Sequence, residues 1–291
     1  MSVGVVLSLI RAKQWYKNLL VFLPLIFSSN LFSINLLLLT SMGFLAFCAA
    51  SSINYILNDI IDKKKDCMHP EKKTRPIASG KISIVGALFV LGLLIFILIL
   101  ILLNLPLIFS LLILTFVVIT QIYSLVFKNI LFADALFISI NFVLRAIAGA
   151  FVVSLGFKPY VVASPWLILS SFFLSLLLVV SKREADIRLL GSAAVKHKKV
   201  LGEYTLEMTG ALMIILTSVL LIVYSIYSVF SYHFALLLSL PFAIFCLFRW
   251  FYLVKSNSII SRHLELAYLD MPIIISGILW FCSVCIGIYL L

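Results

Sequence analysis

Residues 84–103 read IVGALFVLGLLIFILILILL and contain no charged side chain. A helix needs about 20 consecutive apolar residues to cross the hydrocarbon core of a membrane. Lipid offers no partner to a free backbone amide or carbonyl, so a crossing segment of this kind must be helical. The stretch therefore predicts an all-α integral membrane protein.

The whole chain has the composition of such a protein. Its 291 residues are 64% hydrophobic and 11% charged, whereas soluble domains are roughly 25% charged. Working outward from 84–103, we expect nine membrane helices in a single membrane domain, residues 1–291. The predicted spans are about 18–33, 36–57, 84–103, 106–127, 130–154, 161–181, 208–230, 233–253 and 271–290.

The segment 1–17 precedes the first predicted span. Its apolar stretch is followed by Arg11, Lys13 and Lys17, whereas a cleaved signal peptide has its positive charges first. We therefore expect a short helix lying at the membrane interface.

The positive charges are distributed unevenly between the two sides of the membrane. Twenty of the 22 Lys and Arg residues fall on one side, chiefly in the predicted loops 58–83 and 182–207. The opposite side has only Lys158, and Arg145 lies within a span. The positive-inside rule makes the rich side cytoplasmic, with the N-terminus inside and the C-terminus outside. This placement explains the net charge of +11 without nucleic acid as a partner.

The same asymmetry bears on the class of function. A channel or carrier needs polar groups along the whole crossing, whereas the ionisable groups here stop near one surface. We therefore expect an enzyme that acts on a lipid at the cytoplasmic face, and a carrier or flippase is a less favoured alternative.

The five cysteines do not predict a disulfide framework, because they are odd in number and mostly lie in apolar runs. Cys282 and Cys285 form a Cys-x-x-Cys pair with no second pair near it in the sequence. We interpret these two residues as buried thiols in a membrane helix rather than as a metal site.

An acidic motif follows the second predicted span. It consists of Asn58, Asp59, Asp62 and Asp66. On a continuous helix Asn58, Asp62 and Asp66 would stack on one face, and such close carboxylates repel one another unless a cation neutralises them. Mg²⁺ prefers oxygen ligands and is commonly held by one or two carboxylates plus substrate phosphates. The motif therefore predicts a Mg²⁺ site, and its three aspartates are candidate catalytic residues.

Basic residues near these loops predict phosphate binding, because Lys and Arg neutralise the phosphate oxygens that a metal does not hold. The sixth span is followed by Lys182, Arg183 and Asp186, which share one helical face, and Asp186 is a further catalytic candidate. The other candidates for phosphate binding are Lys17, Arg75, Lys81, Tyr123, Lys128 and Arg145. For Arg145 the sequence leaves two roles open, an ion pair with Asp134 or a contact to phosphate. The two charged helix ends, at Asp59 and Asp186, also suggest two four-helix units.

Several motifs together resemble those of a known family. Asn58-Asp-x-x-Asp-x-x-x-Asp66 is similar to the first aspartate motif of the UbiA-type intramembrane prenyltransferase superfamily. The chain more closely resembles the decaprenyl-phosphate phosphoribosyltransferase group of that superfamily. The matching motifs are Arg11-x-Lys-Gln-Trp-x-Lys-Asn18, His69-Pro-x-Lys-x-x-Arg-Pro-Ile-Ala-Ser-Gly80, Tyr123-Ser with Lys128, Phe142-Val-Leu-Arg-Ala-Ile-Ala-Gly149, Ser164-Pro-Trp166, Lys182-Arg183, Tyr204-Thr205 and Asp270-x-Pro272.

The resemblance implies nine helices around a central cavity that opens to the cytoplasmic side. It implies Mg²⁺-dependent transfer of 5-phosphoribosyl from phosphoribosyl diphosphate to a polyprenyl phosphate, within membrane lipid. Asp186 departs from the group, which usually has Glu there, and Glu184 stands where a basic residue is common. The alternative within the superfamily is prenylation of an aromatic or quinone precursor. The sequence leaves a homo-oligomer open.

Overall fold

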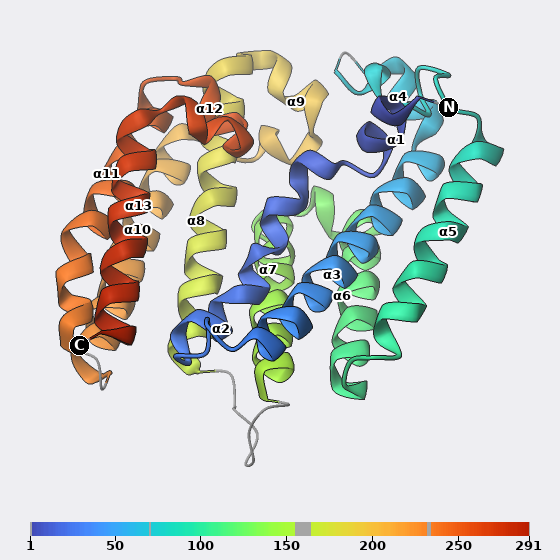
Figure 1. Ribbon diagram of the computed structural model, residues 1–291. Coiled ribbons are helices and arrows are strands. Elements are labelled where there is room, and N and C mark those ends of the chain that lie inside the picture. Colours follow the sequence, from blue (N-terminus) through green and yellow to red (C-terminus); the bar gives the residue numbers. More distant parts are fainter. Residues whose placement is uncertain (1, 70, 155–163, 232–233, 291) are drawn as a thin grey trace. The chain divides into compact units, whose positions relative to one another are not determined.

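The computed structural model describes residues 2–69, 71–154, 164–231 and 234–290, and every regular element in these ranges is helical (Figure 1). The chain forms two compact units. Unit 1 comprises Met1–Leu25, Asn30–Phe127 and Leu144–Ala163, and unit 2 comprises Ile26–Ser29, Lys128–Val143 and Ser164–Leu291.

The helices follow one another along the chain, with η marking a 3₁₀ helix. The elements before residue 155 are α1 (Val3–Leu9), η1 (Ala12–Phe22), α2 (Leu23–Phe27), α3 (Ile34–Ile61), α4 (Lys63–Met68), η2 (Lys72–Thr74), α5 (Ile84–Leu102), α6 (Leu107–Leu125), η3 (Phe127–Asn129) and α7 (Ala133–Val153). The elements after residue 163 are α8 (Pro165–Leu190), η5 (Gly191–Ala193), α9 (Ala194–His197), η6 (Lys199–Gly202), α10 (Leu206–Phe230), η7 (Phe234–Ser239), α11 (Leu240–Lys255), α12 (Ile259–Arg262), η8 (Leu264–Leu269) and α13 (Met271–Tyr289).

Among the described residues, eight helices are long and apolar enough to cross a membrane, and they correspond to eight of the nine predicted spans. These are α3, α5, α6, α7, α8, α10, α11 with the end of η7, and α13. Side-chain caps define several of their starts: Ser83, Thr205 and Asp270 each accept a hydrogen bond from the backbone N–H three residues later. Such caps satisfy amides that have no partner inside the helix. A short helix is present near the N-terminus as α1.

The first predicted span, 18–33, has a different structure. Residues 12–27 form η1 and then α2, and this segment is not among the eight long helices. η1 packs against α3 within unit 1, and its backbone at Val21 lies against Gly149 of α7. A Cβ atom at Gly149 would collide with the carbonyl oxygen of Val21. This segment is therefore not one regular α-helix, and a close approach of its backbone to that of α7 fixes its position.

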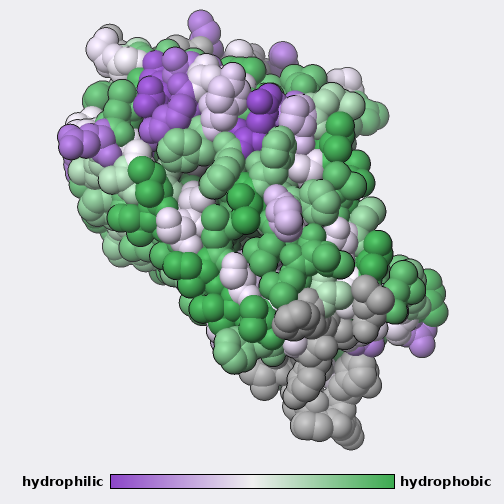
Figure 2. Space-filling view, turned by 90° about the vertical axis from the view of Figure 1, so that its left-hand side faces the viewer, coloured by the Kyte–Doolittle hydropathy of each residue, from purple (hydrophilic) through white to green (hydrophobic). Residues whose placement is uncertain are grey.

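Each unit has its own hydrophobic core. In unit 1, the ring of Phe47 lies edge-on to those of Phe109 and Phe116, with centroids 5.7 Å and 5.3 Å apart. In unit 2, Leu177 and Met213 belong to a buried cluster formed by α8, α10 and α11. On the flank of unit 2 that Figure 2 shows, apolar residues cover the helices and hydrophilic residues gather toward one end. Exposed apolar flanks of this kind suit contact with lipid.

The loop predicted at 182–207 begins instead as helix, which corrects the sequence-based boundary. α8 continues to Leu190 and is followed by η5, α9 and η6. Arg183, Glu184 and Asp186 are buried and ion-paired within unit 2. Because partners elsewhere in the unit neutralise these charges, the helix does not end where the hydropathy falls.

Candidate functional site

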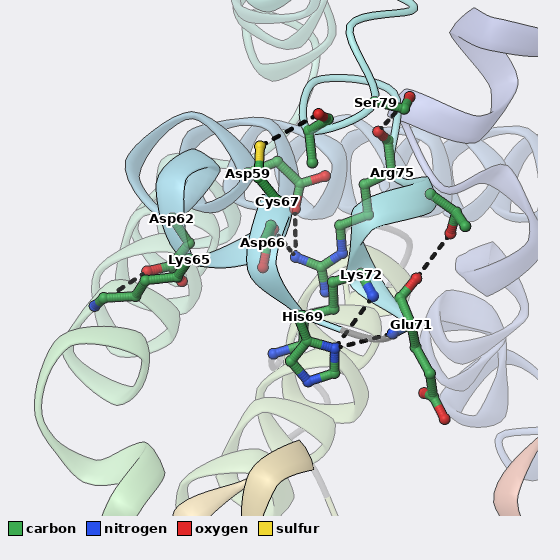
Figure 3. A network of polar contacts seen from close by, with 12 residues as sticks. Asp59, Asp62, Lys65, Asp66, Cys67, His69, Glu71, Lys72, Arg75 and Ser79 are labelled. Carbon is green, nitrogen blue, oxygen red and sulfur yellow. Dashed lines mark hydrogen bonds and ion pairs between the residues drawn. The ribbon is translucent and has the colours of Figure 1, made fainter.

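Two carboxylates of the acidic motif meet at one arginine in unit 1 (Figure 3). Nη1 of Arg75 donates to Oδ1 of Asp59 over 3.0 Å and to Oδ2 of Asp66 over 2.7 Å. Asp59 lies in the last turn of α3 and Asp66 lies in α4, and both are at least 97% buried. The structure thus brings together three of the predicted site residues, with the two carboxylates on the guanidinium of the third.

Arg11 completes this cluster from the N-terminal segment. Its Nη2 donates to Oδ1 of Asp59, and its guanidinium lies 4.5 Å from the ring centroid of Tyr55. Arg11 has a φ of 51°, in the left-handed region, where the chain turns from α1 into η1. We did not predict Arg11 as a site residue. It is the first residue of the motif Arg11–Asn18 quoted above, and this was the sequence signal that could have identified it.

Asp62 is directed elsewhere, which differs from the stacked arrangement expected on a continuous helix. α3 ends at Ile61 and α4 starts at Lys63, and Asp62 between them has φ −88° and ψ 7°. Its carboxylate lies 3.6 Å from Nζ of Lys65 (Figure 3). The backbone N–H of Asp62 still donates to the carbonyl of Asn58. The interruption at Asp62 therefore places Asp59 and Asp66, rather than Asp62 and Asp66, on one cation.

Hydrogen bonds within the segment after Asp66 hold the loop that follows α4. Nδ1 of His69 accepts from the backbone N–H groups of Glu71 and Lys72, and Oγ of Ser79 donates to the carbonyl of Arg75 (Figure 3). These bonds fix the loop that carries Arg75. Lys81 lies beyond it with an exposed side chain.

Three further candidates, Lys17, Tyr123 and Arg145, also lie in unit 1. Nε of Arg145 donates to Oδ1 of Asn18, and its guanidinium lies 4.6 Å from the ring centroid of Phe116. Nζ of Lys17 donates to the side chain of Gln14. Tyr123 is half-buried near the end of α6.

Unit 2 contains a second cluster, centred on a carboxylate. Oδ2 of Asp134, in α7, accepts from Nε of Arg183 over 2.9 Å and from Nζ of Lys198 over 2.7 Å. Oδ1 accepts from the hydroxyl of Tyr204 over 2.8 Å. Asp134 is fully buried. Only Arg183 of this set was predicted as a site residue, because partners 49 to 70 residues apart give no local pattern.

Burial and charge set the protonation of this cluster. Burial, and next the nearby guanidinium of Arg183, lower the pKa of Lys198 to about 8. Burial and the carboxylate of Asp134 raise the pKa of Tyr204, so its phenol keeps the proton that it donates. A buried amine beside a second cation is held in its charged form mainly by Asp134.

The remaining charges near the end of α8 form separate pairs. Oδ1 of Asp186 accepts from Nε of Arg262 over 2.6 Å. Glu184 pairs with Arg188 and Lys255, over 2.8 Å and 2.6 Å. Lys182 is exposed although Arg183 and Asp186 are buried, so the three residues do not share one environment. Lys128 lies in η3, half-buried.

The carboxylates of unit 1 are oxygen donors of the kind that Mg²⁺ prefers, and in the structure Arg75 and Arg11 balance their charge. In the described part of the chain, no group of three or more His, Cys, Asp or Glu side chains is close enough to hold an ion. Asp59 and Asp66 both pair with the guanidinium of Arg75, which lies between them. Two carboxylates with open positions are what Mg²⁺ commonly uses when a substrate supplies phosphate oxygens. The arrangement therefore suits a shared metal rather than a protein-only cage.

Curated proteins resemble this chain in sequence. The chain is 29% identical to the decaprenyl-phosphate phosphoribosyltransferase of Mycolicibacterium smegmatis over 200 residues, covering 67% of this chain and 61% of that protein. It is equally similar to the Corynebacterium glutamicum protein of the same name, covering 58% of that protein. An uncharacterized protein of Sinorhizobium fredii is 32% identical over 62% of this chain and 34% of its own length. The chain thus spans less than two thirds of these relatives.

Solved structures share the fold over almost the whole chain. A UbiA homolog from Archaeoglobus fulgidus, solved with GPP and Mg²⁺, has a TM-score of 0.70 at 18% identity and covers 98% of this chain and 99% of its own. Another structure of a UbiA homolog from Archaeoglobus fulgidus has a TM-score of 0.69 at 17% identity and covers 98% of this chain and 99% of its own. The profile of the UbiA prenyltransferase family matches residues 19–262. This chain is therefore an integral membrane transferase that belongs to the UbiA prenyltransferase family.

Proposed function

We propose that this protein transfers 5-phosphoribosyl from phosphoribosyl diphosphate to a polyprenyl phosphate of the decaprenyl type. The products are polyprenyl-phosphoryl-5-phosphoribose and diphosphate. The observation that carries this proposal is the cation pair of the buried Arg183 and the partly buried Lys198 in unit 2, which exists in addition to the carboxylate cluster of unit 1. Two substrates with phosphate groups need more cationic donors than a single diphosphate does.

The acidic motif is proposed as the site of Mg²⁺ and the diphosphate. Asp59 and Asp66 would hold the ion, with Asn58 and Asp62 as further oxygen donors within two helical turns. When bound, Mg²⁺ neutralises the diphosphate and makes it a better leaving group. Arg75 stands between the two carboxylates and would supply a cation for the remaining diphosphate oxygens. Lys17, Lys81, Tyr123, Lys128, Arg145 and Lys182 stay in the proposal as supporting phosphate contacts.

The chemistry asks little more of the chain. Positive charge develops on the ribose ring as the diphosphate leaves, and a phosphate oxygen of the lipid attacks the anomeric carbon. This acceptor is already ionised at neutral pH, so no strong general base is required. Asp186 is proposed as a catalytic residue that faces the developing positive charge. Positioning and fixed charges would supply the rate.

The membrane arrangement belongs to the same proposal. The residues of η1 and α2 add up to about 30 Å at the usual rises of the two helix types, close to the thickness of the hydrocarbon core. We propose this segment as the ninth crossing, in a single membrane domain with a central cavity that opens to the cytoplasm. The N-terminus would lie inside and the C-terminus outside.

The proposed reaction is tested with the purified full chain in lipid vesicles. Phosphoribosyl diphosphate labelled in the ribose and decaprenyl phosphate are supplied with and without Mg²⁺, and lipid-extractable label is measured. We expect label in the lipid only when Mg²⁺ is present. Prenylation of an aromatic acid without any labelled lipid would identify the aromatic prenyltransferase alternative. Movement of lipid phosphate across the vesicle without Mg²⁺ would identify a flippase.

A further inference from the structure

Unit 2 holds two cationic nitrogens on one carboxylate oxygen. Nε of Arg183 and Nζ of Lys198 lie 2.9 Å and 2.7 Å from Oδ2 of Asp134. The two nitrogens are therefore no more than about 6 Å apart, a spacing that one tetrahedral anion can bridge. The two cations come from α8 and from the turn between α9 and η6.

Arg183 uses only part of its donor capacity in this contact. Its hydrogen bond to Asp134 is made by Nε, and within the described residues its two terminal nitrogens donate to no protein group. The side chain is 7% exposed. A guanidinium with an unused fork suits a phosphate or carboxylate ligand.

Asp134 itself is saturated. Oδ2 takes both cations, and Oδ1 accepts from the hydroxyl of Tyr204, which in turn accepts from the backbone N–H of Phe132. Asp134 thus positions the two cations, and both of its oxygens already accept hydrogen bonds from the protein. At Asp134 itself, one carboxylate thus faces two cations.

We propose that Arg183 and Lys198 bind one phosphate monoester group and that Asp134 is the positioning residue that holds both. This inference rests on the proposed function for the source of the group, which is either the 5-phosphate of the sugar donor or the phosphate of the lipid acceptor. Lys198 is a new ligand and Asp134 a new positioning residue for that reaction. An anion at this place also relieves the repulsion between the two cations.

The protonation of Lys198 is in keeping with such a site. Burial and Arg183 lower its pKa to about 8, while Asp134 and Asp186 act in the opposite direction. The amine is therefore charged at neutral pH but reactive enough to be labelled. A bound phosphate would raise its pKa and protect it.

The test uses amine acylation of the purified full chain in vesicles at pH 7.5, with modification of each lysine followed by mass spectrometry. The two probes are ribose 5-phosphate and farnesyl phosphate. The matched internal control is Lys199, the exposed neighbour of Lys198. We expect at least one probe to slow acylation of Lys198 about tenfold while that of Lys199 changes less than twofold. Protection by only one probe identifies the source of the phosphate, and equal or absent protection of the two lysines overturns the assignment.

Two variants extend the test. Lys198→Met should weaken binding of the protecting probe about tenfold, and Lys199→Met less than twofold. In Asp134→Asn, loss of the carboxylate should move the midpoint of Lys198 acylation below pH 8, which a merely structural role would not require. An unchanged midpoint would contradict the positioning role. If the probes protect Lys198 but no lipid is labelled in the transfer assay, the proposed reaction fails and the phosphate site stands.

Discussion

The central groups of the two charged clusters carry opposite charge. In unit 1 one cation, Arg75, lies between two carboxylates, Asp59 and Asp66, and Arg11 pairs with Asp59 as a second cation. In unit 2 one carboxylate, Asp134, lies between two cations, Arg183 and Lys198. Both central groups are held by side chains from separate elements, so neither arrangement follows from neighbours on one helix.

This inversion indicates different ligands. Paired carboxylates attract a metal ion, and through it a diphosphate. Paired cations attract an anion directly. A reaction that joins a sugar diphosphate to a lipid phosphate needs both kinds of site, whereas a single diphosphate substrate needs only the first. Each variant below removes the centre or the edge of one cluster.

The largest effect is expected for Asp66→Asn. Loss of a metal carboxylate should reduce kcat/KM for phosphoribosyl transfer by more than about 10³-fold, because charge stabilisation supplies most of the rate in such reactions. Asp62→Asn should mainly raise the Mg²⁺ concentration needed for half-maximal activity, since Asp62 faces Lys65. Steady-state assays over a range of Mg²⁺ distinguish the two. A greater loss in Asp62→Asn than in Asp66→Asn would mean that the stacked arrangement is the active one.

Removal of the central carboxylate of unit 2 should act on stability. Asp134→Ala leaves two buried cations without their anion, and breaking a buried pair costs about 3–5 kcal/mol. Tyr204→Phe is the matched control, because it keeps the carboxylate and removes only the hydroxyl, whose hydrogen bonds to Oδ1 of Asp134 and from the N–H of Phe132 are each worth about 1 kcal/mol. Thermal unfolding in detergent would measure both. Equal melting temperatures for the two variants would contradict a central role for Asp134.

A pH dependence is expected from Lys198. Its folded pKa is lowered from 10.5 to about 8, so the amine loses its proton as the pH rises through 8. Binding of ribose 5-phosphate should therefore weaken above pH 8, although the ligand, whose second pKa is about 6, stays doubly charged. The unfolded chain binds more protons between about 8 and 10.5, so this group makes the fold more stable with rising pH. Deprotonation of Lys198 therefore does not destabilise the fold in this pH range, and weaker binding there is not caused by unfolding. In Lys198→Met the dependence above pH 8 should disappear.

The smallest effect is expected at the edge of unit 1. Lys65 is 80% exposed in its pair with Asp62, and exposed pairs contribute about 0–1 kcal/mol. Lys65→Met should leave the melting temperature within about 2 °C of the parent protein. A large destabilisation would show that Asp62 belongs to the buried network after all.

The sequence predicts most of the fold because the membrane imposes a simple rule. Runs such as 84–103 must be helices, and α5 covers 84–102 of that run. The rule fails at residues 12–27, since a 3₁₀ segment that packs through Gly149 has no hydropathy signature. It also places the end of α8 too early, because burial of Arg183 with its partners is invisible to a local count of charges.

The candidate site is only half predictable for a related reason. Asp59, Asp66 and Arg75 lie within one short stretch, so spacing and residue type identify them. The contacts of Asp134 span 49 to 70 residues and depend on how separate helices pack. The interruption at Asp62 is likewise a property of the backbone rather than of the motif.

The different ligands expected for the two clusters, whose central groups carry opposite charge, are tested most directly by binding of two kinds of probe to the same variants. Mn²⁺ with inorganic diphosphate is followed by electron paramagnetic resonance, and ribose 5-phosphate with farnesyl phosphate by protection of lysines from acylation. We predict that Asp66→Asn loses Mn²⁺ binding and keeps protection of Lys198, whereas Arg183→Met keeps Mn²⁺ binding and loses that protection. Loss of both ligands in either variant, with the fold intact, would contradict the account.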